Sequence, residues 1–115
     1  MKKLFLSFLI LYSIPVVAKP VQPISDEAHE KNCRQLMLLA ELAIDGKQKG
    51  MPLSKMLQFN DEAHAKLDEK DMHEVFYGIV VDAYKQPTYT STTLKKDQFS
   101  SFSSKYYLAC IEMYK

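Results

Sequence analysis

The sequence is poor in glycine and has no long apolar run beyond its first 18 residues. Its three glycines, at positions 46, 50 and 78, are too far apart to build the glycine-rich loop that binds nucleotide phosphates. No stretch has the alternation of apolar and polar residues that is typical of strands. Basic residues are not concentrated in any segment, so we expect no nucleic-acid partner. These absences exclude phosphate-loop enzymes and sheet-based folds from consideration.

The first 18 residues have the three parts of a cleavable export signal. Lys2 and Lys3 provide a positive start, an apolar run follows over residues 4–14, and small residues lead up to Ala18. Pro15 ends the helix that the run would form, because proline lacks the backbone donor that a helix needs. The alternative is an uncleaved membrane anchor, but a spanning helix needs about 20 apolar residues. We therefore predict cleavage after Ala18 and a periplasmic or secreted protein.

The mature chain, residues 19–115, is nearly neutral and has the size of a single domain. Lys2 and Lys3 leave with the signal, so 13 basic side chains remain against 14 acidic ones, a net charge of −1. We expect residues 19–24, which contain two prolines, to be an extended lead-in, and residues 25–115 to form one domain. No later segment is long and apolar enough for a membrane span.

Cysteine is scarce, since Cys33 and Cys110 are the only two. In an oxidising compartment they allow one intramolecular disulfide, a common clamp in domains too small to bury a large core. Closing this loop would stabilise the fold by roughly 4.5 kcal/mol in the chain-entropy model. The alternative is a pair of buried free thiols. A disulfide would leave neither sulfur free to act as a nucleophile.

Four stretches of the mature chain have the apolar spacing of amphipathic helices. The first begins near Ser25 and ends at Gly50, and the second begins near Pro52 and fades at residues 68–71. The third ends before Pro87, and a Thr/Ser-rich connection over residues 88–93 leads to the fourth. The predicted inner positions are Cys33, Leu36, Met37, Ala40 and Ile44; Leu53, Met56, Leu57 and Leu67; Met72, Val75, Phe76, Ile79, Val80, Ala83 and Tyr84; and Phe99, Phe102, Tyr106, Ala109, Cys110 and Met113.

The two cysteines lie on the apolar faces of the first and last of these helices. This placement agrees with a bond that ties the two ends of a helical domain together. The sequence therefore predicts an all-α fold, a small four-helix bundle-like domain whose first and last helices are joined by a disulfide.

Several short elements of the mature chain form a recognisable pattern. They are Cys33, Lys47-Gln48-Lys49-Gly50, Met56-Leu57, Ala83-Tyr84 with Pro87 and Tyr89, and Phe102, Tyr106 and Cys110. The chain resembles a group of small exported helical proteins of Gram-negative bacteria and their prophages. That resemblance implies export, helices and a disulfide, without a particular activity. Lys47 stands where the group usually has arginine, which removes the planar fork needed for bidentate recognition.

Two Asp-x-x-His pairs are the candidate metal ligands. Asp26 with His29, and Asp61 with His64, each place a carboxylate and an imidazole on one face of a helix. Di-metal helical bundles use Glu-x-x-His twice with further carboxylates. Here Asp replaces Glu, and both pairs lie near polar helix ends. We therefore interpret them as solvated polar side chains on helix surfaces and expect no metal and no cofactor.

The loop around Pro87 and Tyr89 is the predicted binding segment. Proline limits the entropy lost on ordering, and tyrosine offers a broad amphipathic contact. The alternative is that Tyr89 covers the end of the bundle. Four tyrosines lie off the predicted apolar faces and are candidates for a recognition surface: Tyr77, Tyr89, Tyr107 and Tyr114. We predict a non-catalytic periplasmic interaction protein of the immunity or inhibitor type, with an unknown protein partner. The alternative is a metal-binding or enzymatic protein that uses the Asp-x-x-His pairs.

Overall fold

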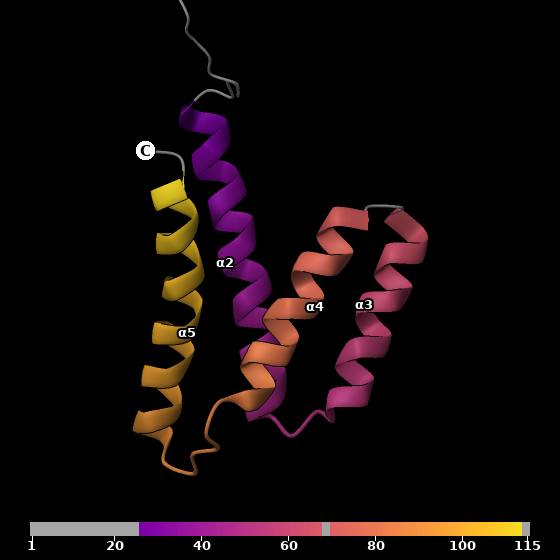
Figure 1. The fold of residues 1–115 in the computed structure, drawn as a ribbon. Coiled ribbons are helices and arrows are strands. Elements are labelled where there is room, and N and C mark those ends of the chain that lie inside the picture. The colour runs from indigo at the N-terminus through magenta and orange to yellow at the C-terminus, as the bar shows by residue number, and fades with distance from the viewer. Residues whose placement is uncertain (1–25, 68–69, 114–115) are drawn as a thin grey trace, which may run out of the picture.

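A computed structural model describes residues 26–67 and 70–113, and these residues form four helices (Figure 1). They are α2 (Asp26–Gln48), α3 (Leu53–Leu67), α4 (Lys70–Lys85) and α5 (Thr92–Met113). The described residues contain no strand, which confirms the all-α prediction. None of the described helices combines the length and apolar character needed to cross a bilayer. The predicted signal (1–18) and lead-in (19–24) lie outside the described residues.

Helix α2 is the centre of the arrangement. It lies antiparallel to α5 on one side and packs against α4 on the other (Figure 1). Helix α3 packs mainly against α4 and has little contact with α2, so it is the outer helix. The result is a bundle-like fold in which α3 is attached through its hairpin partner α4.

The disulfide joins α2 and α5. Cys33 and Cys110 are bonded, with their Cα atoms 5.4 Å apart and a sequence separation of 77. Both cysteines are buried, and the described residues contain no free thiol. The predicted pairing is confirmed, and the alternative of two free thiols is wrong.

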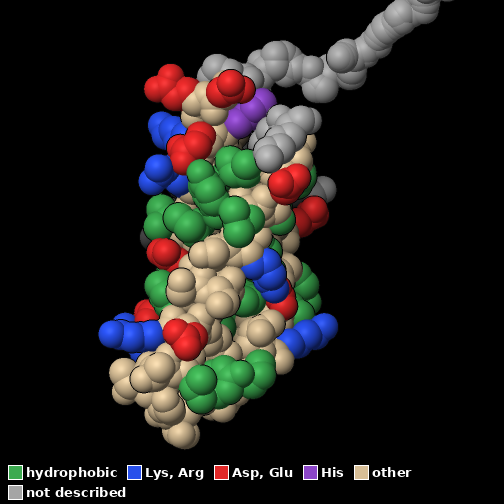
Figure 2. All heavy atoms as spheres, turned by 90° about the vertical axis from the view of Figure 1, so that its left-hand side faces the viewer, with side chains coloured by type: hydrophobic (Ala, Val, Ile, Leu, Met, Phe, Trp, Pro, Cys, Tyr) green, Lys and Arg blue, Asp and Glu red, His purple; other side chains and the backbone are tan. Residues whose placement is uncertain are grey.

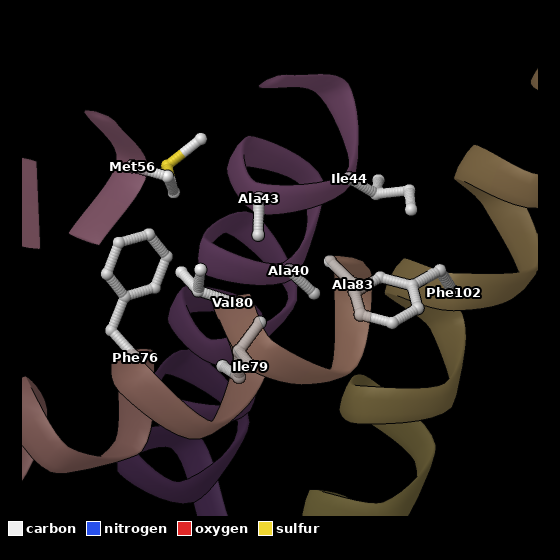
Figure 3. Packing of buried hydrophobic residues seen from close by; sticks show 9 residues of the cluster. All are labelled: Ala40, Ala43, Ile44, Met56, Phe76, Ile79, Val80, Ala83 and Phe102. Atoms are coloured by element: carbon white, nitrogen blue, oxygen red, sulfur yellow. The ribbon is translucent and has the colours of Figure 1, made fainter. Parts of the chain in front are cut away.

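The core lies mainly between α2 and α4. Alanines of α2 face the larger side chains of α4, and α3 and α5 contribute Met56 and Phe102 (Figure 3). The buried cluster consists of Ala40, Ala43, Ile44, Met56, Phe76, Ile79, Val80, Ala83 and Phe102. All but Ala43 were predicted as inner positions from the helical spacing.

Several predicted inner positions are exposed instead. On α4, Met72 and Val75 lie in the N-terminal half of the helix, and burial on this helix begins only at Phe76. On α5, Ala109 is exposed, and Met113 lies beyond the disulfide and is 77 % exposed. Periodicity identifies which face of a helix is apolar, but only the length of the helix–helix contact decides how much of that face is covered.

The helix ends follow local chemistry. At the end of α2, Gly50 has a φ of 87°, the left-handed conformation that suits glycine. The amide of Met51 donates to the Gly46 oxygen (2.9 Å) and that of Gly50 to the Lys47 oxygen (3.0 Å). This pattern is a Schellman motif, and it confirms the predicted helix end. At the start of α5, Ser91 Oγ accepts from the Leu94 amide (3.2 Å), as an N-cap does.

Candidate functional site

The connection between α4 and α5, residues 86–91, contains the predicted binding segment, and side chains of α2 and α5 hold its backbone. Lys47 Nζ donates to the carbonyl oxygen of Pro87 (3.1 Å) and to Thr88 Oγ1 (2.9 Å). Gln98 Nε2 donates to the same Pro87 oxygen (2.8 Å). Pro87 is therefore a fixed point of the loop, because two donors from different helices share its carbonyl group.

A chain of amides extends this anchoring to the first turn of α5. Gln48 Nε2 donates to Gln98 Oε1 (3.0 Å) and to the carbonyl oxygen of Lys95 (2.8 Å). Gln98 is buried, and its amide both accepts and donates, so its polar atoms are satisfied. The Lys47-Gln48 element of the sequence pattern thus fastens the loop and the start of α5 to the end of α2.

Tyr89 lines a hollow beside this fastening. The hollow has a volume of about 330 Å³, and its walls include Leu94, Gln98, Phe102 and Lys105. Tyr89 is half-buried there, whereas Pro87 is exposed. The arrangement combines aromatic, amide and charged groups in a hollow of small-ligand size. The half-buried position of Tyr89 is compatible with both interpretations, and each of them stays a prediction.

A hydrogen-bonded carboxylate lies beside the same hollow. Asp82 Oδ2 accepts from Lys105 Nζ (2.8 Å) and from the Tyr106 hydroxyl, and Oδ1 accepts from Gln86 Nε2 (3.1 Å). Partial burial tends to raise the pKa of Asp82, but the bonds from Lys105 and Tyr106 outweigh it and hold this pKa below its usual value. Burial and the bond to Asp82 raise the pKa of Tyr106. Near neutral pH the Asp82 carboxylate therefore stays ionised and the Tyr106 hydroxyl stays neutral. The two groups suit a structural network better than proton transfer.

The two Asp-x-x-His pairs have different surroundings. Asp26 and His29 lie in the first turns of α2, whereas Asp61 and His64 lie in the second half of α3. Asp61 Oδ1 is 2.9 Å from Nε2 of His73 on α4, and the rings of His64 and His73 are 4.6 Å apart at their centroids. Across residues 26–67 and 70–113, no three His, Cys, Asp or Glu side chains are placed to hold a metal ion. The contact with His73 was missed because residues on different helices share no sequence spacing.

An exposed apolar surface, here called the α2–α3 face, is the other candidate binding region. Two neighbouring hollows of about 370 and 180 Å³ lie on it and share Leu42 and Phe59 as lining residues. Four exposed residues define the face: Leu42 (41 %), Met51 (41 %), Phe59 (48 %) and Met72 (37 %). Leu38, one turn before Leu42 on α2, is also exposed. The face exists because α3, attached mainly to α4, leaves this side of α2 uncovered.

Phe59 is held in place although half of it is exposed. Its ring lies edge to face against the buried ring of Phe76, with centroids 6.3 Å apart and an interplanar angle of 77°. A fixed aromatic ring between two hollows loses little entropy when a partner covers it. Sequence reasoning missed this position because Phe59 lies off the inner face predicted for the second helix.

The chain matches no known protein family, no characterised protein and no solved structure. Any functional conclusion therefore depends on the chain's own surfaces. On the side of the molecule where α5 lies, Lys and Arg side chains alternate with Asp and Glu, and apolar groups lie between them (Figure 2). No single sign of charge dominates that side.

Some tyrosines are hydrogen-bonded within the fold, and others are exposed. Tyr107, predicted as a recognition residue, is half-buried and donates to Glu30 Oε2 (2.8 Å), so it links α5 to α2. Hydrogen bonds from Arg34 and Tyr107 lower the pKa of Glu30. Tyr84 packs on the core and donates to the Met51 oxygen (2.7 Å). Tyr77 is exposed, and Tyr114 lies outside the described residues.

Proposed function

We propose that the mature chain is a non-catalytic interaction protein of the periplasm or the cell exterior, of the immunity or inhibitor type. In this proposal the α2–α3 face captures an apolar segment of a partner protein. The observation that carries the proposal is the continuity of Leu42, Met51, Phe59 and Met72 across two adjoining hollows. Exposed apolar patches of this kind are typical of protein-binding surfaces.

A rigid scaffold supports the exposed α2–α3 face. The disulfide clamps α2 to α5, and the ring of Phe76 packs against that of Phe59. Lys55 and Glu62 border the larger hollow and supply a polar rim around the apolar centre. An aromatic centre with a polar rim is the usual anatomy of a binding hot spot. The alternative metal or enzymatic function lacks an assembled ligand set in the described residues, and no observation favours it.

Capture of a partner from periplasmic extract by the tagged mature protein tests this function. Leu42→Asp and Phe59→Asp each place a charge on the α2–α3 face, and we expect both to abolish capture. Leu108→Asp is the matched control, because Leu108 is 60 % exposed on α5 and does not line either hollow. Leu42→Asp and Leu108→Asp should change stability by less than about 1 kcal/mol. Phe59→Asp also removes the ring contact with Phe76 and should cost about 1–3 kcal/mol, so capture is compared at equal amounts of folded protein.

Two other outcomes would redirect the proposal. Loss of capture in Tyr89→Ala, with capture retained in Leu42→Asp and Phe59→Asp, would assign binding to the hollow beside the α4–α5 loop instead. A dimer of the purified protein that Phe59→Asp converts to a monomer would identify a second copy as the occupant of the face.

A further inference from the structure

The imidazoles of His64 and His73 lie against each other where α3 meets α4. Their ring centroids are 4.6 Å apart, and the planes are inclined by 33°. Both rings line the smaller hollow of the α2–α3 face, together with Leu39, Leu42 and Phe76. Two titratable rings therefore form part of the contact that attaches the outer helix, inside an apolar part of the proposed binding surface.

The two rings differ in their partners. His73 Nε2 is 2.9 Å from Asp61 Oδ1, and the carbonyl oxygen of His73 accepts a hydrogen bond from the buried amide of Asn60 (3.0 Å). His64 Nδ1 is buried and has no hydrogen-bond partner in the part of the chain that the structure describes. A proton on His73 is therefore matched by a carboxylate, whereas among the described residues no group matches a second proton on His64.

Other charged groups near the His64–His73 contact do not supply a counter-charge for His64. On α3, Glu62 accepts a hydrogen bond from Gln58, and Asp61 is engaged by His73. On α4, Asp71 and Glu74 are exposed on either side of His73 in sequence. From α2, the hollow receives only leucine side chains. Within the described residues, none of these carboxylates forms an ion pair with His64.

We propose that His64 and His73 form a proton-operated latch between α3 and α4 that regulates the α2–α3 face. While at least one ring is uncharged, the stacked pair holds the helices together. Acidification adds a proton from solvent to each ring. His73 retains its ion pair with Asp61, but the charge on His64 then faces a second positive ring at stacking distance and carries a buried N–H without an acceptor. Both effects favour separation of α3 from α4.

The fold allows α3 to open by itself. Its main contact is with α4, while α2 and α5 remain joined by the Cys33–Cys110 bond. A locally less stable helix at the edge of a clamped core is the kind of element that opens without global unfolding. Opening would enlarge the hollow beside Phe76 and expose more apolar surface on the face. The regulatory role rests on the proposed function, whereas the latch itself is a property of the helix contact.

Binding of the uncharged dye Nile red by the mature protein tests the latch without any partner. Between about pH 7.5 and pH 5.5, the range in which histidines change charge, we expect dye fluorescence to rise several-fold in the wild type. His64→Phe keeps a flat ring in the stack but cannot take a proton, so its fluorescence should stay constant. Amide exchange of α3, corrected for the intrinsic effect of pH, should accelerate on the order of tenfold in the wild type and not in His64→Phe.

The control is His29→Gln, which changes the third histidine, in α2, and should respond as the wild type does. A pH response that persists unchanged in His64→Phe overturns the latch, and so does a wild type without a response. Either result leaves the α2–α3 face as a binding surface. Conversely, partner capture that survives Leu42→Asp and Phe59→Asp overturns the proposed function. A pH-dependent dye response confined to chains with His64 would still support the latch in that case. If His64→Phe folds poorly, His73→Phe removes the repulsion between the rings but leaves the buried N–H of His64, so it should reduce the response without abolishing it. An unreduced response in His73→Phe would also overturn the latch.

Discussion

The ammonium group of Lys47 lies 3.1 Å from the carbonyl oxygen of Pro87, although the two residues are 40 positions apart in sequence. This contact connects the end of α2 to the loop before α5. It also gives a physical meaning to two elements of the sequence pattern, because Lys47-Gln48 and Pro87 are parts of one fastening. The pattern thus describes how the bundle end is held, and the binding surface that we propose lies elsewhere.

Replacing Lys47 tests the fastening. Lys47→Met removes both hydrogen bonds to the loop and should lower the free energy of unfolding by about 1 kcal/mol. Lys47→Arg can donate to the same acceptors and should be close to the wild type. The matched control is Lys49→Met, which loses only an exposed ion pair with Asp45 (3.1 Å) and should change stability by less than about 0.5 kcal/mol. Equal effects of Lys47→Met and Lys49→Met in chemical denaturation would contradict the assignment.

Reduction of the disulfide should have the largest effect on stability. For a separation of 77 residues, the chain-entropy model assigns the Cys33–Cys110 bond about 4.5 kcal/mol, as an upper figure. The double variant Cys33→Ala/Cys110→Ala should unfold at a much lower denaturant concentration than the oxidised wild type, and about where the reduced wild type does. Coincident unfolding curves for the oxidised and reduced wild type would show that the bond is not a clamp.

Two glycines should respond oppositely to the same change. Gly50→Ala forces a Cβ into a left-handed conformation (φ 87°) and should destabilise by about 1–2 kcal/mol. Gly78 lies within α4, and a Cβ there would meet nothing within 4 Å. Gly78→Ala should therefore stabilise the protein by about 0.5–1 kcal/mol through helix propensity. Thermal unfolding of both variants checks the pair, and a shift in the same direction for both would be inconsistent with this account.

Acid should weaken the network around Asp82. The pKa of Asp82 is lower in the folded protein than its usual value of about 3.9, so the unfolded chain binds more protons in that range. The stabilisation is therefore present above about pH 4 and is lost as the pH falls through the folded pKa.

The variant Asp82→Asn should lose about 1–3 kcal/mol at neutral pH, because Tyr106 and Lys105 lose a charged acceptor. Its stability should also fall less steeply between about pH 5 and pH 2 than that of the wild type. Asp45→Asn, which breaks only the surface pair with Lys49, serves as the control. The same steep acid loss in Asp82→Asn would show that other carboxylates cause it.

The success of sequence reasoning differs between the core and the surfaces. Ala40, Ile44, Val80 and Phe102 were predicted as inner positions and are buried, because apolar residues recur at helical spacing around each of them. Phe59 could not be identified in this way. It lies off the stripe of α3 and matters only because α2 leaves Leu42 uncovered beside it.

The sequence by itself determined the four helices, the end of α2 at Gly50 and the single disulfide, since these depend on neighbours a few residues apart and on a count of two cysteines. The tertiary structure alone decided that α3 lies outside α4, that His64 meets His73, and that Lys47 reaches Pro87. The physical reason is that these contacts join different helices. Their existence depends on how the helices cross and where each one ends, which local periodicity does not specify.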